Sequence, residues 1–140
     1  MPQSLDAIAA CPVLIKCRKN GKQAIKHGHK DLFPVTIQHS IDFENAADQW
    51  KVKQSLNRYD YLVHSNRINA WSAVEIHSAD ASHVIQKKKD TQAILDQHCP
   101  SMSQAIKNWF LCPTADIHRH HKRRISEAGI QTIRNLTDKL

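Results

Sequence analysis

The chain has 140 residues, which is close to the commonest size of one protein domain and too short for two ordinary domains. We therefore expect a single domain that spans residues 1–140. Lys and Arg number 20 against 13 Asp and Glu, and this excess of positive charge favours an anionic partner such as nucleic acid. Three glycines are too few for the glycine-rich phosphate loops of P-loop and dinucleotide-binding proteins, so both classes are excluded.

Hydropathy and cysteine usage indicate the compartment. The apolar runs are far shorter than the roughly 20 residues of a membrane-spanning helix, and the first ten residues lack the pattern of a secretion signal. We therefore expect a cytoplasmic protein with no membrane partner. Without a secretion signal, and with enough apolar residues for a core, the chain does not need disulfides, so we expect reduced thiols at Cys11, Cys17, Cys99 and Cys112. Their spacing does not match that of a structural zinc site.

Taken in chain order, the first half predicts a helix, a strand and a second helix. The first thirty residues favour helix, with Ser4 as a capping residue and Pro12 in a first helical turn. Apolar residues then alternate from Val35 to Phe43, which is the two-residue period of a strand. Asp42 can cap a short helix that follows this strand.

The second half begins with two strand-like segments, residues 59–64 and 70–77, which flank a polar turn and predict a β-hairpin. Asp80 can cap a helix that ends near Cys99, and residues 109–112 form a short apolar strand. Thr114 can cap a basic helix that stops at Gly129. The order predicts an α/β fold whose mixed central sheet of about four strands is flanked by helices.

The hairpin brings two acidic residues together if its register follows from the turn. When residues 66–69 form a four-residue loop, Ser65 pairs with Ala70, and Asp60 falls directly opposite Glu75. His77 then shares the face of Glu75, because residues two apart on a strand point the same way. We expect this face to be the functional one and the opposite, apolar face to pack against the core.

These residues resemble the PD-(D/E)xK nuclease superfamily. Its core runs helix, three strands, helix, strand, and its motif places one acid on the second strand and Glu or Asp, any residue, and Lys on the third. Asp60 matches the first acid, and Glu75-Ile76-His77 matches the second half with His in place of Lys. Tyr59 stands where the family has proline, and the resemblance covers about residues 34–112.

The resemblance implies a metal-dependent nuclease. Asp60 and Glu75 would hold Mg²⁺ or Mn²⁺, and His77 would take the place of the lysine that orients or deprotonates the attacking water. Lys87 or Lys88 would supply the positive charge that a neutral histidine lacks, by reaching in from the next helix. Loss of activity with retention of the fold is a second interpretation.

The distribution of basic residues predicts a nucleic-acid-binding surface, which would include Lys88 and a dense basic cluster at residues 118–124. The members of this cluster expected to contact phosphates are Arg119, Lys122, Arg123 and Arg124. His118 and His121, three apart on a helix, could in addition bind a metal ion adventitiously. The alternatives to the nuclease are an inactive module of the same fold that binds nucleic acid or protein, and a small regulatory or scaffold protein whose acids are structural.

Overall fold

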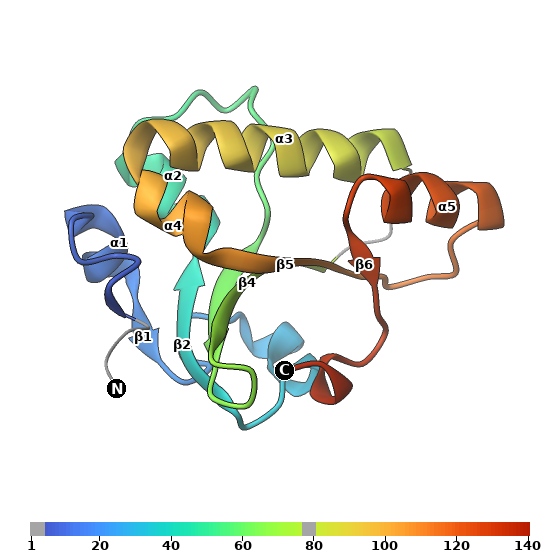
Figure 1. The fold of residues 1–140 in the computed structure, drawn as a ribbon, viewed down its shortest axis with the longest axis horizontal. Helices are drawn as coiled ribbons and strands as arrows, with labels where there is room; N and C mark the ends of the chain where they lie inside the picture. Colours follow the sequence, from blue (N-terminus) through green and yellow to red (C-terminus); the bar gives the residue numbers. More distant parts are fainter. Residues whose placement is uncertain (1–4, 77–80) are drawn as a thin grey trace.

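A six-stranded mixed sheet organises the protein, and the computed structural model describes residues 5–76 and 81–140 (Figure 1). The strands lie in sequence order, with β1 to β4 antiparallel to one another and β4, β5 and β6 parallel. They are β1 (Lys19–Asn20), β2 (Ile37–Asp42), β3 (Tyr61–Ser65), β4 (Ala70–Ile76), β5 (Ile106–Cys112) and β6 (Gln131–Thr132). The helices are α1 (Pro12–Cys17), η2 (His27–Leu32), α2 (Phe43–Gln49), α3 (Ala81–His98), α4 (Pro100–Ala105), α5 (Arg119–Glu127) and η3 (Leu136–Asp138).

The predicted α/β class is confirmed, but the sheet has six strands instead of about four. The four longer strands are those indicated by the apolar pattern. The two additional strands, β1 and β6, form the edges and have two residues each, which is too short to show an alternating pattern. The prediction of helix throughout the first thirty residues was wrong, because β1 and non-helical turns lie within residues 5–30.

Local signals explain several helix boundaries. Pro12 occupies the first turn of α1, and the Asp42 side chain accepts a hydrogen bond from the Asn45 backbone N–H at the start of α2. Gly129 follows α5 with a φ of +80°, as predicted. The predicted cap of α5 was wrong: Thr114 lies outside the helix, and the His118 side chain accepts from the His120 N–H instead. Ser4 and Asp80, the two other predicted caps, lie outside the described residues.

The α-helices cover one face of the sheet, and η2 and the C-terminal segment with η3 lie against the other (Figure 1). On the helical face, Leu62, Ala73 and Leu111 pack against side chains from α1 to α5. On the opposite face, Val63 and Val74 pack with residues that include Phe33, Leu136 and Leu140. Both faces of β3 and β4 are therefore buried, and the expectation of one apolar and one open polar face was wrong.

A disulfide joins Cys11, just before α1, to Cys99, between α3 and α4, over a sequence separation of 88 residues. The prediction of reduced thiols was therefore wrong for this pair, whose spacing along the chain gave no sign that the fold would bring the two together. Cys17 and Cys112 are buried free thiols. Within residues 5–76 and 81–140, no helix is long and apolar enough to cross a membrane.

Candidate functional site

Asp60 and Glu75 meet at the open end of the β3–β4 hairpin. Ser65 pairs with Ala70 and Tyr61 with Val74, which is the predicted register and sets Asp60 opposite Glu75. Each carboxylate is held by the other strand. The Asp60 N–H donates to Oε1 of Glu75 at 3.1 Å, and the Ile76 N–H donates to Oδ2 of Asp60 at 3.0 Å. The two acids are thus fixed by the backbone of the sheet and not by flexible loops.

Lys87 completes the group from α3, where its ammonium forms a salt bridge with Oε2 of Glu75. The side chain of Lys87 is 16% exposed, whereas that of Glu75 is only 1% exposed, so the contact is shielded from water on the Glu75 side. The sequence prediction had Lys87 or Lys88 as the cation that reaches in, and the structure brings Lys87 to the acids. One acid on each strand and one lysine on the following helix therefore converge.

The environment of Glu75 disfavours its charged form. Burial, and secondly the negative charge of Asp60, raise the pKa of Glu75 to about 7, although the hydrogen bond and charge of Lys87 act in the opposite direction. Carboxylates perturbed by burial and by a like charge concentrate at functional sites. Tyr59, which precedes Asp60, is fully buried, and burial with these same two acids raises its pKa.

Asp60 and Lys87 line a polar pocket of about 300 Å³. Its remaining walls come from α2, from the segment that leads into β3, and from the first half of α3. They are Glu44, Gln54, Leu56, Asn57, Arg58 and His83. Because Asp60 is partly exposed here while Glu75 is buried, a ligand would reach the pair from the Asp60 side.

Arg58 organises the wall formed by the segment that leads into β3. Its guanidinium binds Asp48 at 2.8 Å and also donates to the carbonyl oxygens of Val52 and Lys53, both at 3.1 Å. The Asn57 N–H donates to Asp90 of α3 at 3.0 Å, which ties the same segment to the helix. Hydrogen bonds to Asp48 of α2 and to Asp90 of α3 therefore hold this wall in place.

Of the eight residues that line the pocket, sequence reasoning named only Asp60 and Lys87, and the ionisable residues that it missed are Glu44, Arg58 and His83. Only His83 had a detectable signal, because it lies four residues before Lys87 and so shares its helix face. His77, predicted to replace the motif lysine, lies outside the described residues.

Lys88 does not face the acids. Its ammonium donates to the Ala128 carbonyl oxygen at 2.8 Å, beyond the end of α5, and lies 5.5 Å from the centre of the Trp109 ring. Lys88 thus joins α3 to α5, and this internal role leaves it poorly suited to the phosphate contact that was predicted. Its neighbour Lys89 is exposed.

The basic helix α5 lies beside the first half of α3 (Figure 1). Arg124 donates to Ser82 of α3 at 3.0 Å, and the Ala81 N–H donates to Nδ1 of His121 at 3.1 Å. The side chains of Arg119, Lys122, Arg123 and Arg124 are exposed. His121 is engaged with α3, and the described residues contain no group of three or more His, Cys, Asp or Glu that could hold a metal ion.

The donor set at Asp60 and Glu75 suits a hard divalent ion better than a transition metal. Mg²⁺ prefers oxygen ligands and is commonly held by one or two carboxylates, with waters and substrate phosphates in the remaining positions. Oδ2 of Asp60 and both oxygens of Glu75 have protein partners, whereas Oδ1 of Asp60 receives no hydrogen bond within the described part of the chain. Within the described residues, Oδ1 of Asp60 is therefore the carboxylate oxygen of this pair that a ligand could use without displacing a protein partner.

Comparisons with known proteins do not identify the chain: no family model, curated protein or solved structure matches it.

Proposed function

We propose that this protein is a metal-dependent nucleic-acid phosphodiesterase of the PD-(D/E)xK type. The observation that carries the proposal is the convergence of Asp60, Glu75 and Lys87 at the ends of two paired central strands. From β2 to β5 the chain also has three strands, then helix, then a strand, as in the core that the resemblance implies, with α2 and α4 as additional helices. Mg²⁺ or Mn²⁺ is the proposed cofactor.

Each residue has a distinct part in this proposal. Asp60 and Glu75 would hold the metal, which when bound polarises a phosphate and lowers the pKa of an attacking water. Lys87 holds a positive charge beside Glu75, where it would stabilise negative charge that develops on the phosphate. We infer that Lys87, coming from the helix, takes the position left open by the absence of lysine from the strand motif.

Nucleic acid is the proposed substrate because α5 places four permanent positive charges next to the helix that carries Lys87. Lys87 faces the acids and its neighbour Lys88 faces α5, so α3 lies between the pocket and the basic helix. A helix is about 10 Å wide, which is close enough for one nucleic-acid backbone to contact both.

One observation favours the second candidate, an inactive module that binds nucleic acid through α5. Lys87 already neutralises Glu75, which is also what a purely structural acid pair would require. In this alternative Arg119, Lys122, Arg123 and Arg124 bind phosphates and the acids only stabilise the hairpin.

The test is calorimetric titration of the folded protein with Mg²⁺ and Mn²⁺, followed by a plasmid-nicking assay on the same samples. We expect Asp60→Asn to abolish metal binding and cleavage. Lys87→Met should retain metal binding and lose roughly 100-fold or more in cleavage rate, as for other charge-stabilising groups. The matched control is Lys89→Met, which removes an exposed lysine two residues away on the same helix.

The two candidates give different results. If the folded parent neither binds metal nor cleaves, the nuclease proposal is wrong. Nucleic-acid binding that Arg123→Glu weakens would then support the module. Absence of both metal binding and nucleic-acid binding would reject both candidates and leave the acids with a structural role.

A further inference from the structure

A pocket of about 520 Å³ lies between the second half of α3 and the segment that joins α2 to β3, which runs over this helix (Figure 1). The joining segment contributes residues between 50 and 56, and α3 contributes residues between 93 and 98. Leu56, which is exposed, also lines the pocket that contains Asp60 and Lys87. Lys87 and Ile94 are seven residues apart on α3, which is about 10 Å at 1.5 Å per residue. The two pockets are therefore adjacent, and a chain-like ligand held in one can extend into the other.

Trp50 and His98 form a stacked aromatic pair in this pocket. Their ring centres are 4.8 Å apart and their planes are 9° from parallel. Both side chains are partly exposed, whereas the other two tryptophans, Trp71 and Trp109, are 2% and 7% exposed. A flat ligand ring that enters the pocket therefore meets an existing stack of aromatic side chains.

Two lysines give the same pocket positive charge. Lys51 and Lys53 lie on either side of Val52, are exposed, and form no salt bridge with any residue in the described part of the chain. None of the described residues that line the pocket is acidic. The combination favours a ligand that carries both an aromatic ring and negative charge.

Lys51 occupies a backbone position at which glycine is usual. It follows the last turn of α2 with a φ of +60°. Its N–H donates to the Asp48 carbonyl oxygen and the Val52 N–H donates to that of Ala47, both at 3.0 Å. This is the Schellman arrangement, in which the left-handed residue is commonly glycine because a side chain is strained there. A lysine at a strained position in the wall of a pocket points to a use of its charge.

We propose that this pocket holds an unpaired base of the nucleic-acid strand whose phosphate enters the pocket of Asp60. The substrate is then single-stranded beside the cleaved bond, as in a free single strand, a flap or an overhang. This inference rests on the proposed function, for which it names the substrate class. The base would stack on the aromatic pair, and Lys51 and Lys53 would contact the neighbouring phosphates. A base inside a duplex is stacked between other bases, so only an unpaired base can stack on side chains in a pocket.

The experiment is a titration of the full chain with a single-stranded oligonucleotide, in EDTA so that neither metal binding nor cleavage contributes. Tryptophan fluorescence is the readout, because Trp50 is partly exposed, the other two indoles are buried, and a base stacked on Trp50 should quench its emission. We expect the single strand to bind at least about ten-fold more tightly than a duplex of the same length. In Trp50→Phe the quenching should be lost, while binding measured by the anisotropy of a labelled oligonucleotide changes little.

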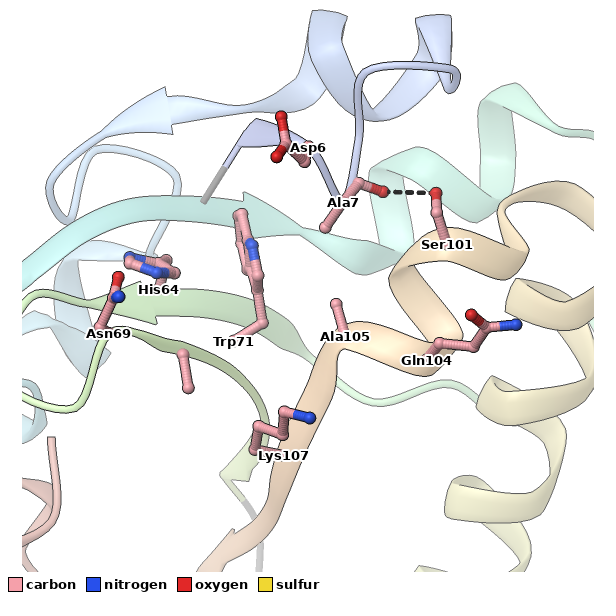
Figure 2. A pocket seen from close by; sticks show the side chains of 10 residues that line it. Asp6, Ala7, His64, Asn69, Trp71, Ser101, Gln104, Ala105 and Lys107 are labelled. Atoms are coloured by element: carbon pink, nitrogen blue, oxygen red, sulfur yellow. Dashed lines mark hydrogen bonds between the residues drawn. The ribbon is translucent and has the colours of Figure 1, made fainter. Parts of the chain in front are cut away.

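Three substitutions locate the base and its phosphates. Trp50→Leu should weaken single-strand binding by about ten-fold or more. Lys51→Gly removes the charge where glycine is favoured, so it should not lower the melting temperature. Lys51→Gly and Lys53→Gln should each reduce the slope of log affinity against log salt concentration by about 0.7. The matched control is Lys107→Gln, because Lys107 is exposed but lines a different pocket, near the turn of the β3–β4 hairpin (Figure 2).

Three results would overturn the inference. They are equal affinity for single strand and duplex, parent-like binding by both Trp50→Leu and Lys51→Gly, and a loss in Lys107→Gln as large as that in Lys53→Gln. Quenching by an acidic peptide with one phenylalanine, without quenching by the oligonucleotide, would assign the pocket to a protein partner and would also overturn it.

The outcome is independent of the test of the proposed function. Each of the overturning results can occur in a protein that binds metal and cleaves through Asp60 and Glu75. Absence of metal binding, together with a single-strand preference that depends on Trp50, would reject the phosphodiesterase and support the base pocket.

Discussion

Replacing Glu75 by glutamine should stabilise the protein at neutral and alkaline pH, although it removes a charged residue from a salt bridge. The pKa of Glu75 is about 7 in the folded protein against 4.5 in an unfolded chain. Because the folded value is the higher one, the unfolded state loses its proton first, and stability falls as the pH rises from 4.5 to 7. Above pH 7 the full cost is present.

The size of this cost follows from the two pKa values. At 1.36 kcal/mol for each pKa unit, the gap corresponds to roughly 3 kcal/mol. Glutamine has nearly the same shape but cannot ionise, so it avoids this cost while Lys87 keeps a polar neighbour. We expect Glu75→Gln to raise the free energy of unfolding at pH 8 by up to about 3 kcal/mol, with little change at pH 4.

Urea denaturation of both proteins between pH 4 and pH 8 measures the difference. Glu44→Gln is the matched control, because Glu44 lines the same pocket but is exposed and should change stability little. If Glu75→Gln is less stable than the parent at pH 8, the salt bridge with Lys87 outweighs the burial cost and the reasoning is refuted. A gain in stability with loss of metal binding would indicate that function maintains the unfavourable carboxylate.

Three further predictions concern the remainder of the fold. Replacing Cys11 and Cys99 together by alanine should lower the free energy of unfolding by about 4–5 kcal/mol on the chain-entropy model, and reductant should change the melting temperature of the parent but not of the variant. Burial lowers the pKa of His39 to about 4, so its contribution to stability falls as the pH drops from 6.5 to 4. His39→Gln should therefore lose less stability than the parent between pH 7 and pH 4.5, which urea denaturation of the two proteins at both pH values measures. Lys88→Met should destabilise by about 1–2 kcal/mol in thermal unfolding, and an equal effect of Lys89→Met would contradict the assigned contact with α5.

The hairpin and its register could be predicted from the sequence, because they depend on residues that are close together along the chain. Alternating apolar residues on both sides of a four-residue turn allow few pairings, and the observed pairing of Ser65 with Ala70 places Asp60 opposite Glu75. The helix after Asp42 and the end of α5 at Gly129 could be predicted for the same reason. A capping side chain or a left-handed glycine acts within one helical turn.

Contacts between distant segments were decided only by the tertiary structure. Nothing near Cys11 indicates that Cys99 will lie beside it, because the two are 88 positions apart and meet only through the packing of α1 against the rest of the fold. The orientation of α3 likewise determines that Lys87 faces Glu75 while Lys88 turns to α5, although the two lysines are adjacent in the sequence. Local periodicity can assign residues to a helix face, but only the packing of that helix on the sheet decides which groups the face meets.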